Sequence, residues 1–131
     1  MEKITYRMAT AMDAAFVALV VAEAVGGALM ERVCKGHKTD RDRALLKQLT
    51  AVCRRDDTLY SWRHTRLAVN AGGQPVGALV AYVGEGYRER RARTFALLEE
   101  FVTFDVDRMD DETRDGEYYL DSLAVLPPWR G

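Results

Sequence analysis

The sequence predicts a mixed α+β fold in which helices flank a mainly antiparallel central sheet. Three observations lead to this prediction. A short alternating segment opens the chain, two helical segments with apolar stripes follow it, and a β-hairpin, a third helical segment and a final apolar strand complete the order. The two strands of a hairpin are antiparallel and therefore set the direction of the sheet.

The composition is that of one globular domain, and we expect residues 1–131 to form it. The net charge of −1 excludes a general electrostatic attraction to nucleic acid or to acidic membranes. Apolar runs are too short to span a bilayer, and the first residues lack the layout of a signal peptide. Because Cys34 and Cys53 form no CxxC motif, two reduced thiols in a cytoplasmic protein are expected.

The first half of the chain predicts one strand and two capped helices. Residues 3–8 alternate like a strand, and Thr10 and Asp13 have the spacing of a capping box. An apolar stripe continues to residue 25, where Gly26 and Gly27 predict a break or kink. The same capping signal recurs over residues 39–42 before a second amphipathic helix with a regular stripe. That stripe consists of Leu45, Leu49, Val52 and Cys53, so Cys53 is interpreted as a buried small hydrophobe rather than a nucleophile.

The second half predicts a hairpin, a helix and the last strand. Residues 62–70 and 75–83 form the hairpin strands around Gly72 and Gly73, and the second strand is apolar enough to be central and covered on both faces. Residues 87–104 predict a helix whose arginines form a solvated basic face, with phosphate binding as the alternative. An acidic stretch follows at residues 105–115, and it fails the spacing of a calcium loop. We therefore expect no metal site, and the stretch is interpreted as a surface loop, with attraction of a cationic amine as the alternative.

The end of the chain carries the most specific motif. Residues 123–131 read Leu-Ala-Val-Leu-Pro-Pro-Trp-Arg-Gly, in which Pro127, Arg130 and Gly131 have the spacing Pro-x-x-Arg-Gly. This stretch resembles the GCN5-related N-acetyltransferases, where a Leu-x-Val strand leads into a Pro-x-x-Arg-Gly-x-Gly-x-Gly loop. The resemblance implies an acyl-CoA N-acyltransferase-like domain that is truncated after its fourth strand. It extends, less specifically, to residues 4–13 and 75–80.

The resemblance implies acetyl-CoA as the acyl donor and a primary amine, on a small molecule or a protein, as the acceptor. Backbone groups of Leu123, Ala124 and Val125 would bind the pantetheine arm. The loop that begins at Arg130 and Gly131 would bind the pyrophosphate through backbone amides at a helix N-terminus. The thioester would then be held beside the amine, so that attack becomes effectively intramolecular.

A general base must take the proton from an ammonium substrate. The family's usual position for a carboxylate aligns with Tyr119, whose phenol cannot serve at neutral pH without a large pKa shift. Glu117 and Asp121 lie two residues to either side, on the same face if the strand is regular. Asp121 is the preferred base, and a purely structural role for it stays open.

Two other hypotheses remain beside the enzyme. The chain could be a non-catalytic module of this fold that associates through its exposed strand edge, or an unrelated α+β binding domain. Because an uncovered last strand is an aggregation hazard, we expect a homodimer, a partner chain or a missing C-terminal segment to cover it. We expect the isolated 131-residue chain to have little or no activity.

Overall fold

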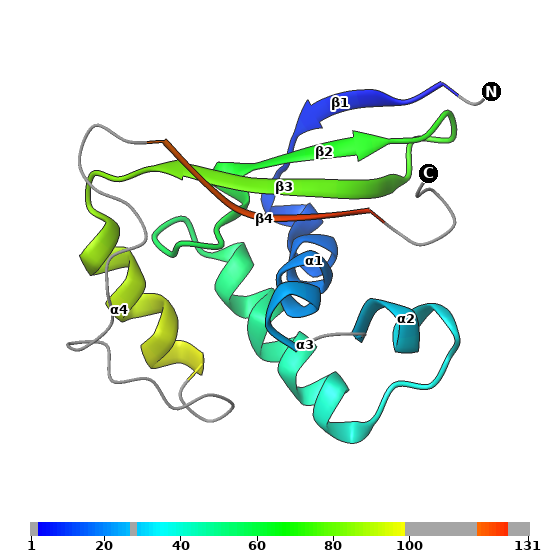
Figure 1. The fold of residues 1–131 in the computed structure, drawn as a ribbon, viewed down its shortest axis with the longest axis horizontal. Helices are drawn as coiled ribbons and strands as arrows, with labels where there is room; N and C mark the ends of the chain where they lie inside the picture. The colour runs from blue at the N-terminus through cyan, green and yellow to red at the C-terminus, as the bar shows by residue number, and fades with distance from the viewer. Residues whose placement is uncertain (1–2, 27–28, 99–117, 126–131) are drawn as a thin grey trace.

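The computed structural model describes residues 3–26, 29–98 and 118–125, which form one four-stranded sheet and four α-helices (Figure 1). Two short 3₁₀ turns, Ala11–Asp13 and Trp62–His64, precede α1 and β2. The elements run in the order β1 (Thr5–Met8), α1 (Ala14–Gly26), α2 (Leu29–Cys34), α3 (Asp40–Arg54), β2 (Thr65–Val69), β3 (Pro75–Val83), α4 (Tyr87–Leu98) and β4 (Tyr118–Val125).

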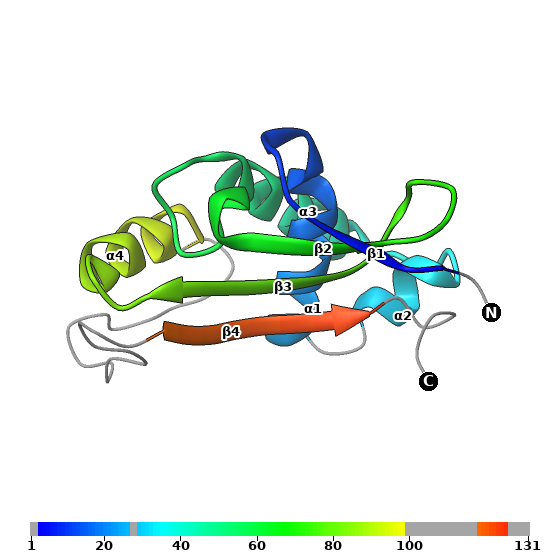
Figure 2. The ribbon, with the colours of Figure 1, turned by 90° about the horizontal axis from the view of Figure 1, so that it is seen from above.

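The sheet has the strand order β1-β2-β3-β4, and every neighbouring pair is antiparallel (Figure 2). Leu67 of β2 pairs with Ala78 of β3, and Tyr6 of β1 pairs with Ala68 of β2. β1 and β4 are therefore the edge strands of the sheet that the described residues form. The predicted α+β class, with a mainly antiparallel sheet, is confirmed.

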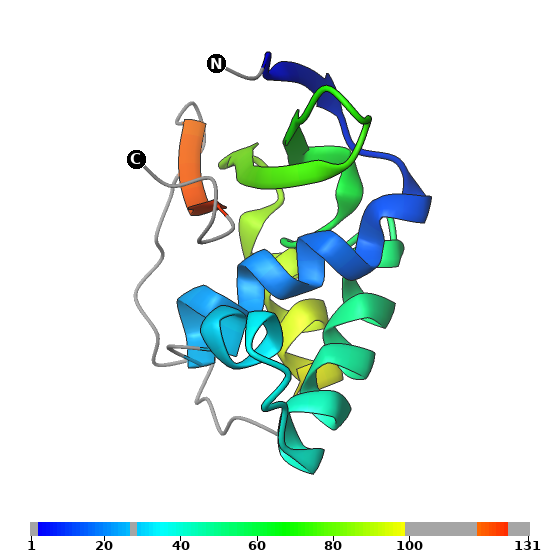
Figure 3. The same cartoon turned by 90° about the vertical axis from the view of Figure 1, so that its right-hand side faces the viewer.

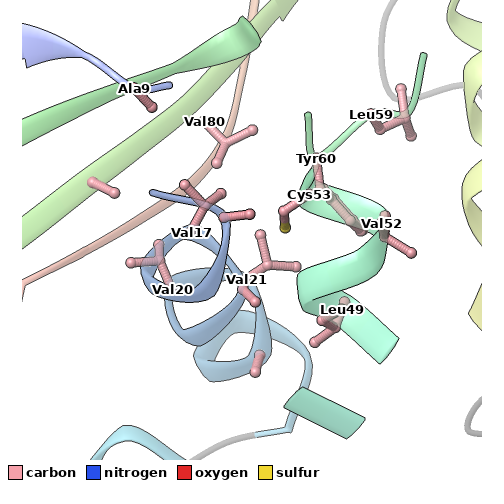
Figure 4. Packing of buried hydrophobic residues seen from close by; sticks show 14 of the residues in the cluster. Ala9, Val17, Val20, Val21, Leu49, Val52, Cys53, Leu59, Tyr60 and Val80 are labelled. Atoms are coloured by element: carbon pink, nitrogen blue, oxygen red, sulfur yellow. The ribbon is translucent and has the colours of Figure 1, made fainter. Parts of the chain in front are cut away.

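All four helices lie on one side of the sheet, as Figures 1 and 3 show. The core fills the space between α1, α3 and the sheet (Figure 4). Burying a side chain of this size stabilises the folded state by about 1.5–3 kcal/mol, so the apolar layer between the helices and the sheet supplies most of the favourable free energy of folding. Its fully buried members include Val17, Val20 and Val21 of α1, Leu49, Val52 and Cys53 of α3, and Leu67 and Val80 of the sheet.

Both predicted capping boxes mark the starts of helical segments. The Thr39 side chain accepts a hydrogen bond from the Asp42 N–H, and Asp42 Oδ2 accepts one from the Thr39 N–H, both at 3.0 Å. At the earlier site the Thr10 N–H donates to Asp13 Oδ2 at 2.8 Å. Gly36 ends the preceding helical segment with a φ of 73°, a left-handed conformation that suits glycine.

The hairpin has the predicted faces, with two corrections. The first strand was expected over residues 62–70, but β2 begins at Thr65 because Trp62–His64 form a 3₁₀ turn. Thr65, Leu67 and Val69 of β2 are buried against the helices, and Gly73 turns the chain with a φ of 82°. β3 is central, as predicted, but it is not fully covered on both faces. Leu79 is only half-buried and Val83 is exposed, because the described residues place no helix on the second face of the sheet.

The arginines of α4 correct a further expectation. Arg91 is buried and lies 5.4 Å from the centre of the Tyr87 ring. Arg90 donates to the Val83 carbonyl at 2.9 Å, and Arg93 donates to the Asp57 carbonyl at 2.7 Å. Arg90 and Arg93 therefore tie the helix to the end of β3 and to the loop after α3, and the predicted solvated face is present only in part, because Arg88 and Arg93 are exposed whereas Arg91 is buried. Residues 99–117, with the rest of the expected helix and the acidic stretch, lie outside the described residues.

Candidate functional site

Strand β4 carries five of the predicted site residues on the edge of the sheet. Leu123 pairs with Leu79, Ala124 with Ala78, and Val125 with Gly77, all on the β3 side. No strand in the described part of the chain pairs with the other side of β4. An edge strand presents a row of N–H and C=O groups along its outer side, which can bind an extended amide-containing ligand.

The ladder between β3 and β4 is interrupted at Asp121. Val80 pairs with Ser122, whereas the next residue, Ala81, pairs with Leu120. Asp121 is thus an extra residue on β4, which is the pattern of a β-bulge. A bulge bends the strand, re-aims a side chain and takes one residue out of the regular ladder. The residue that the sequence favours as the base lies at this irregularity.

The bulge also removes the premise that Glu117 and Asp121 share a face of a regular strand. Tyr119 pairs with Tyr82 before the bulge, and Ser122 pairs with Val80 after it, so simple alternation does not hold between them. Glu117, Arg130 and Gly131 lie outside the described residues. The structure brings Tyr119, Asp121 and the 123–125 segment onto one strand.

A cavity of about 560 Å³ opens beside Arg66 and Leu79, which alternate with strand residues that are buried on the helix side of the sheet. An adjoining cavity of about 360 Å³ shares Arg66 and Leu79 with it and extends toward Tyr6 on β1. The first is lined by Met8, Arg63, His64, Arg66, Leu79, Ala81, Tyr82 and Val83. The polar side chains among these lining residues are therefore two guanidinium groups, one imidazole and the phenol of Tyr82.

His64 is a site residue that the sequence reasoning missed. It is half-buried, its ring lies 5.9 Å edge-on from the Tyr82 ring, and its Nε2 is buried without a hydrogen-bond partner. Burial, with Arg90 and Arg63 nearby, lowers the pKa of this imidazole, so it is neutral at neutral pH. The available signal was its place beside Arg66 on the outward face of the predicted strand.

The other titratable groups have structural roles. Cys53 is fully buried in the core, as predicted, and burial raises the pKa of its thiol to about 12. Arg7 forms a two-pronged ion pair with Asp13 at 2.8 and 3.0 Å, and this holds the pKa of the Asp13 carboxyl at about 2. No cluster of metal-ligating side chains occurs within residues 3–26, 29–98 and 118–125.

None of the helices in the described part of the chain is long and apolar enough to cross a membrane.

Two solved structures share this arrangement of elements. An N-acetyltransferase from Staphylococcus aureus Mu50 superposes with a TM-score of 0.71 at 21% sequence identity, and the match covers 97% of this chain and 68% of that protein. A second acetyltransferase superposes with a TM-score of 0.69 at 18% identity, covering 97% and 66%. No protein-family model matches the sequence, and no curated protein matches it significantly. The chain therefore has the acyl-CoA N-acyltransferase fold, and it spans about two thirds of the length of these neighbours.

Proposed function

We propose that this chain is the N-terminal part of an acetyl-CoA-dependent N-acetyltransferase of the GCN5-related type, which acetylates the primary amine of a small molecule or a protein. One observation carries the proposal: within an acyltransferase fold, β4 is both an edge strand and bulged at Asp121. A bulged edge strand offers free backbone groups beside a carboxylate. Such backbone groups would hold the thioester, and the carboxylate would take a proton from the amine.

Acetyl-CoA would supply an activated acetyl thioester. The outer backbone groups of Leu123, Ala124 and Val125 fit the amide groups of its pantetheine arm, because both are extended and hydrogen-bond along their length. A backbone group released from the ladder by the bulge would donate to the oxygen that gains charge as the amine attacks. Arg130 and Gly131 would start the pyrophosphate-binding turn.

Asp121 would accept the proton of the ammonium group, directly or through a water molecule. Glu117 is the alternative base, and Tyr119 would act at the same strand as a wall of the acceptor site. A positioned base contributes about 10²–10⁴-fold to such a reaction. Replacing it without changing its shape should therefore affect turnover far more than the affinity for acetyl-CoA.

The test replaces Asp121 by Asn in the full translated product of the gene. We expect kcat to fall by about 10²-fold or more while the Kd for acetyl-CoA changes less than about twofold. Asp40→Asn is the matched control, because the Asp40 carboxylate is fully exposed at the start of α3. Unchanged turnover in Asp121→Asn would remove Asp121 from the mechanism and leave Glu117 to be tested in the same way.

The chain spans 68% and 66% of the two acetyltransferase structures. We propose that the isolated 131 residues have little activity and that a further segment or a second copy completes the site. The intact mass of the purified protein separates these cases. A mass well above 14.8 kDa indicates a continuous segment, and a mass of 14.8 kDa turns attention to a homodimer or a partner chain.

A second candidate function rests on the outer edge of β4. A non-catalytic module could add a strand from another chain to this edge through main-chain hydrogen bonds. Concentration-dependent dimerisation in sedimentation experiments, without any binding of acetyl-CoA, would favour this function over the enzyme.

A further inference from the structure

Tyr82 of β3 is the centre of an aromatic cluster that lies next to the bulge of β4. We propose that Tyr82 is a positioning residue for the reaction: together with α4 it fixes the place on β4 where the bulge forms, and with it the place of Asp121. The inference rests on the proposed acetyl transfer, because it concerns how Asp121 is placed for that reaction. It also gives a role to α4, which the proposed chemistry does not use.

The ring of Tyr82 is held by contacts from two elements. Its side chain is only 1% exposed. The His64 ring, from the turn before β2, meets it edge-on at 5.9 Å, and the Tyr87 ring of α4 stacks on it at 6.1 Å. The Arg90 guanidinium of α4 lies 5.8 Å from the centre of the same ring. A ring packed in this way has little freedom to move, so the backbone of β3 at Tyr82 is held in one position.

The start of α4 is placed closely against the end of β3 (Figure 1). Arg90 donates to the Val83 carbonyl at 2.9 Å, one residue beyond Tyr82. Gly86 makes this approach possible, because its φ is 72° and a Cβ there would lie 2.9 Å from Nη1 of Arg90. The turn between β3 and α4 therefore brings Arg90 and Tyr87 back onto Tyr82, and α4 supports the strand that pairs with β4.

The pairing of β3 with β4 connects this support to Asp121. Tyr82 pairs with Tyr119 on one side of the bulge, and Val80 pairs with Ser122 on the other. Val80 is fully buried, so the bulge lies between two fixed points of β3. If the point at Tyr82 were loose, β4 could pair in regular register up to its first residues. Asp121 would then enter the ladder and point to a different face.

The test compares Tyr82→Leu, which removes the ring, with Tyr82→Phe, which keeps it, in the full translated product of the gene. Tyr60→Leu is the matched control, because Tyr60 is another buried aromatic residue of the core, in the loop after α3. Backbone nuclear Overhauser effects between residues 82 and 119, and between 80 and 122, report the register. We expect Tyr82→Leu to lose the 82–119 signal, and Tyr82→Phe and Tyr60→Leu to keep both signals.

Turnover is the second readout, with spermidine, glucosamine and a lysine-containing peptide as trial acceptors. We expect Tyr82→Leu to lower kcat by about tenfold or more while the Kd for acetyl-CoA changes less than about twofold. Tyr87→Leu, which removes the α4 side of the stack, should lower kcat in the same way. Tyr60→Leu should lower the melting temperature and leave kcat unchanged, which separates positioning from a general loss of stability.

An intact 82–119 signal in Tyr82→Leu would overturn the proposal, and so would equal losses of kcat in Tyr82→Leu and Tyr60→Leu. If Tyr82→Leu does not fold, the same signal in Tyr87→Leu decides. If the wild type acetylates none of the three amines, the register alone decides, because it is observed without turnover. A wild type that neither binds acetyl-CoA nor acetylates an amine would contradict the proposed function, whatever the register of the variants.

Discussion

Ala81 of β3 lies opposite Leu120 of β4, although its neighbour Val80 lies opposite Ser122. This one-residue slip makes Asp121 the extra residue of a bulge at the edge of the sheet. The carboxylate and a released backbone group therefore come from the same point of the chain. The proposed acetyl transfer depends on having the carboxylate and the released backbone group at the same point of β4. The pairing of β4 with β3 holds that point in place.

The Thr94 hydroxyl connects α4 to the loop after α3. It accepts a hydrogen bond from the buried Leu59 N–H at 2.9 Å and donates to the Arg90 carbonyl at 2.6 Å. Thr94→Val keeps the shape but leaves the Leu59 N–H unpaired, so we expect a loss of about 1–3 kcal/mol in the free energy of unfolding. Urea denaturation measures it.

Thr50→Val is the matched control for that prediction. The Thr50 hydroxyl donates only to the Leu46 carbonyl of its own helix, at 2.6 Å. We expect this change to stay within about 0.5 kcal/mol. Equal losses of unfolding free energy in the two variants would show that the hydrogen bond from the Leu59 N–H does not contribute more to stability than a bond within one helix.

Asp13 predicts a pH dependence of stability at acid pH. Its pKa is lowered to about 2 by the Arg7 guanidinium and by the Thr10 N–H, against 3.8 for the unfolded chain. A lowered folded-state pKa stabilises the protein above pH 3.8, and this contribution is lost as the pH falls toward 2. Asp13→Asn should therefore lower the melting temperature at pH 7, by an amount that shrinks between pH 4 and pH 2. A pH-independent difference would contradict this account.

We expect His64 to make the stability of the fold depend on pH in a higher pH range than Asp13 does. Because its pKa is lowered in the folded state, the unfolded chain binds the proton more tightly. Its contribution to stability is complete above about pH 6.5 and declines as the pH falls below that value. His64→Gln should flatten the melting temperature between pH 7 and pH 5. A wild-type slope in His64→Gln would contradict this account.

We expect the Cys53 thiol to be unreactive in the native protein and reactive once the protein is unfolded. With a pKa of about 12 and full burial, only about 10⁻⁴ of the groups are thiolate at pH 8. We expect iodoacetamide to leave the Cys53 peptide unmodified in the native protein and to modify it readily in guanidinium chloride. Mass spectrometry of the digested protein measures both. Rapid native labelling of that peptide would show that the core opens locally at α3.

Local signals in the sequence predicted much of this fold. Thr39 and Asp42 are three residues apart, so their capping box could be predicted without tertiary structure. The stripe of Leu49, Val52 and Cys53 likewise repeats at helical spacing and is buried as expected.

The missed features depend on partners that lie far apart in the chain. The bulge at Asp121 exists only in the pairing of β4 with β3, so alternation along one strand could not predict it. The pKa of His64 is lowered by burial and by Arg90, and both depend on how the fold brings distant segments together. Arg91 is a different case: it was predicted to be solvated but is buried, and the Tyr87 ring under its guanidinium lies one turn away on the same helix.

The binding of acetyl-CoA along β4 is the central claim, and hydrogen exchange with and without acetyl-CoA tests it most directly. The full translated product of the gene is compared at saturating acetyl-CoA and in its absence. The account predicts slower exchange of the amides of residues 121–125, with no change in α3. Unchanged exchange along β4, at a concentration where a control acetyltransferase is protected, would contradict it.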